Sequence, residues 1–199
     1  MDYWSEFRPA MFGEPYLVWH EGADFATIRR RYRREPNEVA EQLTAGLAIG
    51  DHVAAQAMGE IGDARFVPEL QRAFETESGE VRVSAALAYL RITGDQSASS
   101  VVSTVLAGDG SEFVRSTAAR ALRNFSATSA LIDAAAAGAR DAHYLVRFHS
   151  ADTLLAFAGK HPDVSANRPL FSRLASDAAP GSWASASDEL ANAARSRLR

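Results

Sequence analysis

The stretch that decides the fold reads VRSTAARAL and spans residues 114–122. Its central pair of alanines recurs along the chain, followed each time by a small residue and then by a larger apolar one. The pairs are Ala54-Ala55, Ala85-Ala86, Ala118-Ala119 and Ser150-Ala151. They start 31, 33 and 32 residues apart, and a period of this length is typical of stacked helical repeats.

Other positions recur in register with these pairs. A valine–arginine dipeptide precedes three of them, at Val81-Arg82, Val114-Arg115 and Val146-Arg147, and Gly50-Asp51 stands in its place before the first. A turn follows each of the first three pairs and leads into a second amphipathic stretch. The apolar residues of these stretches are Val67, Leu70 and Phe74; Val101, Val105 and Leu106; and Leu131, Ile132 and Ala135. Helices of roughly 10 to 15 residues are marginal alone in water, so the pattern predicts helical pairs that bury a continuous core by stacking.

At these residues the sequence resembles the HEAT-like repeat of the phycobilisome-lyase type, whose core reads Val-Arg, two residues, Ala-Ala, one residue, Ala-Leu-Gly. Residues 114–122 match this core nearly completely, and residues 54–63 match its later half, including the Gly62-Asp63 turn. The resemblance extends over roughly residues 36–176. It implies an all-α fold, a right-handed α-α superhelix (a HEAT-repeat solenoid), and it implies little about function because unrelated proteins use this repeat.

The first 35 residues differ from the rest. They hold eight of the 18 aromatic residues, namely Tyr3, Trp4, Phe7, Phe12, Tyr16, Trp19, Phe25 and Tyr32. Prolines and glycines in this segment argue against long helices. We expect a short strand at residues 16–19 and either a second strand or a helical turn at residues 25–32. So many apolar groups would not stay in water, so residues 1–35 should pack as a cap on a solenoid of about four helical pairs.

The solenoid is expected over residues 36–199. Its first half-unit, 36–50, begins at Pro36 and places Val39, Leu43 and Leu47 on one helical face. Full units follow at 51–78, 79–110, 111–142 and 143–176. A terminal cap at 177–199 should contain a loop at 178–182 and a helix at about 187–198, with Leu190, Ala194 and Leu198 on one face.

A weaker resemblance concerns the layout of the chain. A strand-like stretch at residues 15–18, a helix at 38–47 and then HEAT units look like the C-terminal region of some bacterial metallo-aminopeptidases. In that family the region packs beside a separate zinc-bearing catalytic domain. No zinc motif is present here, so the resemblance implies at most a catalytically silent module or a detached relative.

Composition excludes several classes of function. The net charge of −4 argues against general attraction to nucleic acid, and the absence of cysteine removes disulfides, thiol catalysis and cysteine-based zinc sites. No run of about 18 uncharged apolar residues occurs, so we expect no membrane span. The start of the chain lacks the features of a signal peptide. We therefore expect a cytoplasmic protein.

The five histidines do not predict a metal site. His20-Glu21 lacks the second histidine four residues later that a metalloprotease helix needs. His143 and His149 are six residues apart, on largely different helical faces, and His161 lies beyond a turn. We expect no catalytic constellation, no metal and no cofactor, and the chain is not expected to be an enzyme.

The repeated arginines Arg82, Arg115 and Arg147 allow two interpretations. They could form a ligand-binding row. A structural ladder is favoured, because an arginine at a fixed repeat position usually pairs with an acid or a carbonyl of the neighbouring unit. Acidic residues lie close by at Glu80, Asp109, Glu112 and Asp141.

Partner binding is the leading functional hypothesis: a non-catalytic scaffold that holds a protein or peptide in its concave face. The candidate contact residues lie in the basic run at 29–34, at one further arginine and on the second helices; they are Arg30, Arg31, Tyr32, Arg33, Arg72, Ser99, Ser103 and Asp133. One alternative is an accessory or regulatory domain of a lyase or metallopeptidase whose active site lies elsewhere. Another is nucleic-acid binding through residues 29–34, which the overall charge disfavours.

Overall fold

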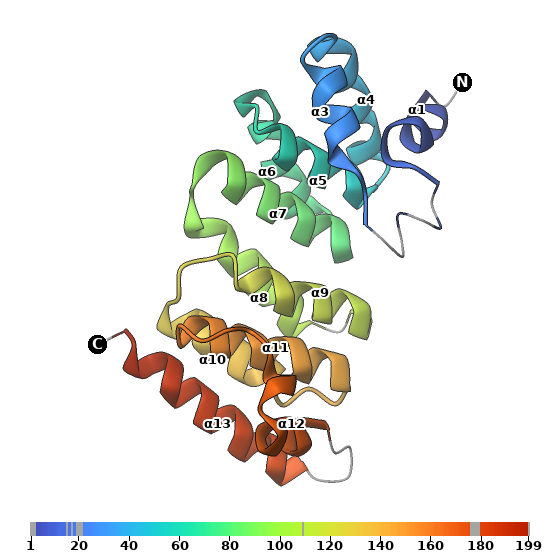
Figure 1. The fold of residues 1–199 in the computed structure, drawn as a ribbon. Coiled ribbons are helices and arrows are strands. Elements are labelled where there is room, and N and C mark those ends of the chain that lie inside the picture. The colour runs from blue at the N-terminus through green and yellow to red at the C-terminus, as the bar shows by residue number, and fades with distance from the viewer. Residues whose placement is uncertain are drawn as a thin grey trace. The chain divides into compact units, whose positions relative to one another are not determined.

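A computed structural model describes residues 3–14, 16, 18, 22–108, 110–175 and 180–198. The regular secondary structure of these residues is helical, which confirms the all-α prediction (Figure 1). By its internal contacts the chain divides into two compact units, Met1–Ala98 and Ser99–Arg199.

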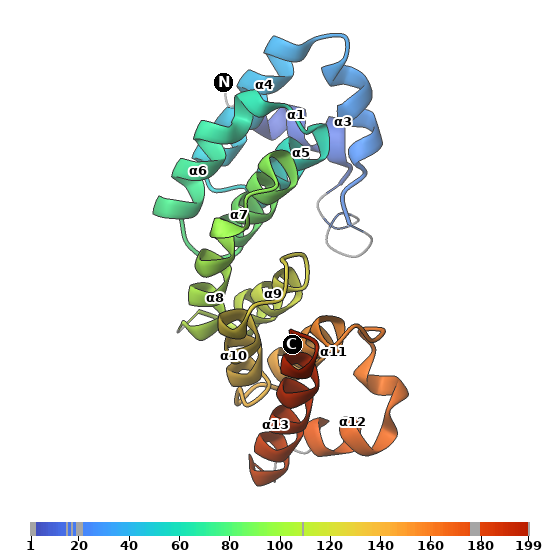
Figure 2. The same cartoon turned by 90° about the vertical axis from the view of Figure 1, so that its left-hand side faces the viewer.

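The first unit contains six α-helices among its described residues and two 3-10 turns. They are α1 (Tyr3–Phe12), α3 (Phe25–Tyr32), α4 (Pro36–Ala48), α5 (His52–Ile61), η1 (Ala64–Phe66), α6 (Val67–Thr76), α7 (Gly79–Thr93) and η2 (Gln96–Ala98). Helices α3, α5 and α7 pack in succession as a row of first helices, and α4 contacts α6 as a row of second helices (Figures 1 and 2). The face predicted for α4 is buried, since Val39 and Leu43 are inaccessible and Leu47 nearly so.

Small residues allow the first helices to approach closely. Ala54, Ala55, Ala85 and Ala86 are fully buried. On α5, a β-carbon added at Gly59 would lie 2.9 Å from the Cα atom of Ala88 on α7. Backbones this close leave no room for larger side chains, which is why the repeat requires alanine and glycine at these positions.

Several aromatic side chains of the N-terminal segment are buried in this unit. Trp4, Phe7 and Phe12 are buried, and α1 packs against α3 and α4. The Trp4 and Phe7 rings stack with centroids 5.8 Å apart. Trp4 fits against Gly46 of α4, where an added β-carbon would lie 2.5 Å from the indole ring. Burial of these rings supplies the hydrophobic contact that anchors α1.

The expected strand at residues 16–19 is wrong for the residues that are described there. Tyr16 and Val18 are helical, and the Val18 amide donates to the Glu14 carbonyl oxygen at 3.0 Å. Leu17 and Trp19 lie outside the described residues. Residues 25–32 form helix α3, whose N-cap Asp24 accepts a hydrogen bond from the Ala26 amide. A four-residue apolar run is too short for its periodicity to separate strand from helix.

The second unit contains α8 (Ser99–Ala107), α9 (Glu112–Leu122), α10 (Ser129–Gly138), α11 (Tyr144–Phe157), η3 (Val164–Ala166), α12 (Arg168–Ala175) and α13 (Pro180–Ser196). Helix α9 packs on α11 as a row of first helices, and α8, α10 and α13 pack in succession as second helices. Buried hydroxyls tie neighbours together: Thr153 donates to the Ala119 carbonyl at 2.6 Å, and Ser187 to the Ala136 carbonyl at 2.7 Å.

Three details of this unit differ from the sequence expectation. On α8, Val102 and Leu106 are buried, whereas Val101 and Val105 are only half-buried. Helix α13 begins at Pro180, not near residue 187, so the expected loop is helical from Pro180 onward and its earlier residues lie outside the described part. Leu190 and Ala194 are buried as expected, but Leu198 lies beyond the helix and is 44% exposed. Proline starts a helix as readily as it interrupts one.

Candidate functional site

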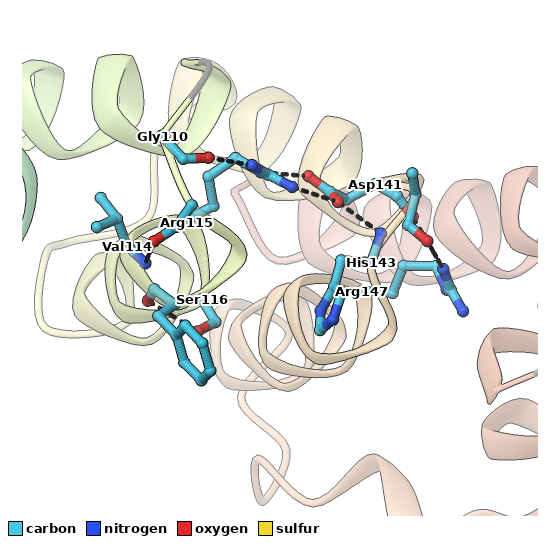
Figure 3. Close-up of polar contacts among 10 residues, drawn as sticks. Gly110, Val114, Arg115, Ser116, Asp141, His143 and Arg147 are labelled. Carbon is cyan, nitrogen blue, oxygen red and sulfur yellow. Dashed lines mark hydrogen bonds and ion pairs between the residues drawn. The ribbon is translucent and has the colours of Figure 1, made fainter.

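The three repeated arginines are held by acceptors of the protein itself. Arg82 on α7 donates through Nε to the Phe74 carbonyl oxygen at 2.8 Å. Arg115 on α9 binds both carboxylate oxygens of Asp141, at 2.7 and 3.0 Å, and also the Gly110 carbonyl (Figure 3). Paired hydrogen bonds of this kind fix the geometry of a guanidinium more tightly than a single bond does.

Asp141 lies between two of these arginines, in the turn that joins α10 to α11. Its carboxylate accepts hydrogen bonds from Arg115 and from the His143 amide at 2.7 Å, and its carbonyl oxygen accepts one from Arg147 at 3.0 Å (Figure 3). Burial acts to raise the pKa of Asp141, but the hydrogen bond from Arg115 and the other donors outweigh it, and the pKa is lowered. The turn is thus held from both sides by arginines of successive first helices.

Arg147 is the most deeply buried of the three and has no accessible surface. Besides Asp141 it donates to the carbonyl oxygens of Leu174 at 2.8 Å and Ala142 at 2.7 Å. Its guanidinium carbon lies 3.9 Å from the ring centroid of Trp183. These contacts of Arg147 join α11 to α12 and α13.

The basic run at residues 29–34 lies on α3 and in the turn after it. Arg29 pairs with Glu60 at 3.0 Å, and Arg31 pairs with Glu35 and Glu38 at 2.9 and 2.7 Å. The arginines that face solvent instead are Arg30, Arg33 and Arg34. The run is therefore divided between internal ion pairs and exposed charge.

Tyr32 belongs to the internal part of this run. Its hydroxyl donates to Asp63 at 2.6 Å, and its ring packs against Phe66 with centroids 5.9 Å apart. Burial, followed by the hydrogen bond to Asp63, raises the pKa of Tyr32 to about 12. The same hydrogen bond is the main cause of the lowered pKa of Asp63. Tyr32 thus fastens α3 to the turn after α5.

The other proposed contact residues are scattered over both units. Arg72 on α6 is exposed and lies 3.5 Å from Glu69. On α8, the Ser103 hydroxyl donates to the Ser99 carbonyl oxygen at 3.0 Å. Asp133 on α10 is exposed and pairs with Arg195 of α13. Only the residues on α8 and α10 lie on neighbouring second helices.

Sequence reasoning missed a polar cluster between α9 and α11. Arg123, the residue that caps the C-terminal end of α9, and His149 on α11 each have a buried nitrogen, Nε and Nδ1 respectively, without a hydrogen-bond partner among the described residues. Burial, followed by the charges of Arg120 and Arg123, lowers the pKa of His149 to about 4. Asp152, which accepts a hydrogen bond from the Val164 amide at 2.8 Å, has a pKa raised by burial. Its position directly after the buried Ser150-Ala151 pair of α11 was the available signal.

We predict that stability falls as the pH decreases from about 6.5 towards 4, and that His149→Gln reduces this loss. An unfolded chain binds the imidazole proton near pH 6.5, whereas the folded chain binds it only near pH 4. Protonation therefore has no effect well above pH 6.5 and favours unfolding below it, by on the order of 1–3 kcal/mol at pH 4.

Urea titrations of the wild type and the variant, each near pH 7 and near pH 4.5, measure this difference. Asp152 acts in the opposite direction, because its raised pKa favours the folded state at low pH. That contribution is present in both proteins, so it largely cancels in the comparison. Equal losses in wild type and variant would show that His149 is not the responsible group.

An open pocket in the first unit also escaped sequence reasoning. It is lined by Trp4, Ser5, Arg8, Pro9, Ile49, Gly50, Asp51 and His52. The Trp4 indole and Arg8 both donate to Asp51, whose other oxygen accepts from the Val53 amide at 2.9 Å. Ile49 is 65% exposed at its edge. The polar groups of Trp4, Arg8 and Asp51 in this pocket are thus hydrogen-bonded to one another.

No metal-binding cluster of three or more histidine, aspartate or glutamate side chains occurs in the described part of the chain. His20 and Glu21 lie outside that part. None of the helices that the structure describes combines the length and apolar character needed to cross a bilayer.

Rows of first and second helices that stack within each unit define the class: this is an α-helical repeat protein. Residues 38–123 match the family model described as HEAT repeats, so this stretch of the chain is similar to HEAT-repeat proteins. The match does not distinguish the phycobilisome-lyase type from other HEAT repeats. No curated protein and no solved structure showed a significant match to the chain.

Proposed function

We propose that the chain is a non-catalytic interaction module that holds a protein or peptide partner on its second helices, the concave side of a HEAT superhelix. HEAT repeats generally serve as scaffolds for protein interaction, and solenoids bind along such extended surfaces. The observation that carries the proposal is the exposed face of two neighbouring second helices, α8 and α10.

This face, here named the second-helix surface, consists of small side chains and one carboxylate. Its residues are Ser100, Ser103, Thr104 and Ala107 on α8, and Ala130, Asp133, Ala134 and Ala137 on α10. They recur at three- and four-residue spacing on the side of each helix opposite Val102, Leu106, Ile132 and Ala135, which are buried.

The chemistry of the second-helix surface suits a helix or an extended peptide. The hydroxyls of Ser103 and Thr104 donate to carbonyl oxygens one turn earlier in their own helix, both at 3.0 Å. A partner would therefore meet mainly methyl and methylene groups beside the Asp133 carboxylate. Short side chains also permit close approach of a partner backbone, as at the close contact of α5 and α7.

The double variant Thr104→Arg with Ala137→Arg tests this proposal. Two long charged side chains on the second-helix surface should reduce the amount of specifically captured partner about ten-fold or more in affinity capture with quantitative mass spectrometry. Both positions are exposed, so the fold should persist, and circular dichroism checks this.

The matched control is Ala64→Arg with Ser172→Arg, which adds the same charge at exposed positions on η1 and α12. Capture by the control should equal that of the wild type. The proposal is wrong if both double variants capture the same proteins in the same amounts as the wild type, or if both lose them equally.

A further inference from the structure

Helix α3 distributes its arginines over three directions. Ile28 is buried in the core of the unit. Arg29 and Tyr32, three residues apart, reach Glu60 and Asp63 at the end of α5. Arg31 turns towards α4 and α1, where it pairs with Glu38 and lies 5.4 Å from the centroid of the Phe7 ring. These contacts occupy two sides of the helix.

The third direction is occupied by Arg30, Arg33 and Arg34. Arg33 keeps right-handed helical backbone angles, so the three residues follow helical i, i+3, i+4 spacing and lie on one face. All three are exposed, and none forms an ion pair with an acidic side chain in the described part of the chain. Arg30 has a neutral partner, the Thr27 hydroxyl at 2.9 Å.

We propose that Arg30, Arg33 and Arg34 form a docking site for an acidic segment of a protein partner. The argument is charge complementarity: three guanidinium groups on one face present donors that match successive carboxylates. The net charge of −4 does not cancel the local attraction of these arginines for carboxylates, because charges spread over the molecule are screened beyond about 8 Å at physiological salt.

A protein segment fits this face better than nucleic acid does. Glu35, Glu38, Glu60 and Asp63 lie among the arginines, where they pair with Arg31, Arg29 and Arg65. A continuous phosphate backbone would pass close to these carboxylates and be repelled. An acidic peptide can place its few carboxylates on the three exposed arginines and uncharged residues beside the glutamates.

This inference goes beyond the proposed function, because the site lies in the first unit and the second-helix surface lies in the other. Either can fail without the other. Substitutions at residues 30, 33 and 34 leave α8 and α10 unchanged, so the two experiments report on separate sites.

The test compares two fluorescent probes by anisotropy at about 50 mM salt: a peptide of about ten residues in which three glutamates are separated by uncharged residues, and a single-stranded oligothymidylate of the same length. The peptide should bind the wild type, and more tightly than the oligonucleotide does. The triple variant Arg30→Gln, Arg33→Gln, Arg34→Gln should bind the peptide about ten-fold or more weakly.

The control variant is Lys160→Gln, Arg168→Gln, Arg197→Gln, which removes the same charge from exposed positions of the second unit. It should change peptide affinity by less than about two-fold. If both triple variants bound the peptide equally weakly, the loss of affinity would follow from net charge alone, and the proposal would be overturned. Tighter binding of the oligonucleotide, or no binding of the peptide to the wild type, would overturn it as well.

Discussion

Replacing Arg147 by alanine should lower the free energy of unfolding of the Ser99–Arg199 unit by about 3–5 kcal/mol. The buried guanidinium donates to the carbonyl oxygens of Leu174, Asp141 and Ala142 and stacks on Trp183. Alanine would remove the donor from these carbonyls and leave a cavity beside the indole. A unit of this size is stable by only about 5–15 kcal/mol, so the midpoint of urea unfolding should move far.

Two further variants separate the causes of this loss. Arg147→Met keeps much of the side-chain volume but no donor, so it should be nearly as unstable as the alanine variant if hydrogen bonds dominate. Arg82→Ala is the matched control, since Arg82 holds the same repeat position but is only half-buried and bonds the Phe74 carbonyl through Nε. It should cost about 1 kcal/mol. A structural role for Arg147 would be refuted if Arg147→Ala lowered the free energy of unfolding no more than Arg82→Ala does.

Gly59→Ala should destabilise the Met1–Ala98 unit by about 1–3 kcal/mol. Alanine is intrinsically the better helix former, by about 1 kcal/mol, so helix propensity alone predicts the opposite sign. The added β-carbon would lie 2.9 Å from both Cα and Cβ of Ala88, which is closer than such atoms pack. Helices α5 and α7 would have to move apart, and the packing between them would loosen.

Gly181→Ala is the matched control for this prediction. Gly181 lies in the first turn of α13, is exposed, and has nothing within 4 Å of an added β-carbon. That variant should be unchanged or more stable, by up to about 1 kcal/mol. Thermal and urea unfolding followed by circular dichroism measure both. If Gly59→Ala proved as stable as the wild type, the close approach of α5 and α7 would not be a constraint on the fold.

Much of the fold could be predicted because each repeat packs the same small residues against the adjacent repeats. The pairs led by Ala54, Ala85 and Ala118 are buried, as a helix that must touch another helix on two sides requires. The strand at residues 16–19 and the start of the last helix were mistaken. Short apolar runs, and a proline followed by glycine, are compatible with more than one local conformation.

The candidate site was harder to predict. The arginine row could be identified because its members hold one repeat position, but the acceptors of Arg147 lie 5, 6 and 27 residues away along the chain. In the basic run, composition marked residues 29–34 as a group, yet Tyr32 and Arg31 turned out to contact Asp63 and Glu38. The cluster of Arg123, His149 and Asp152 left no periodic signal.

By itself the sequence determined the all-α class, the period of the helical pairs and the residues that face inward, because burial of small and apolar side chains follows helical periodicity. Only the tertiary structure decided which arginines remain exposed, which carbonyls receive Arg147 and why His149 resists protonation. Those properties depend on distances between side chains that are remote in sequence. Such distances are set when helices pack, and no local pattern encodes them.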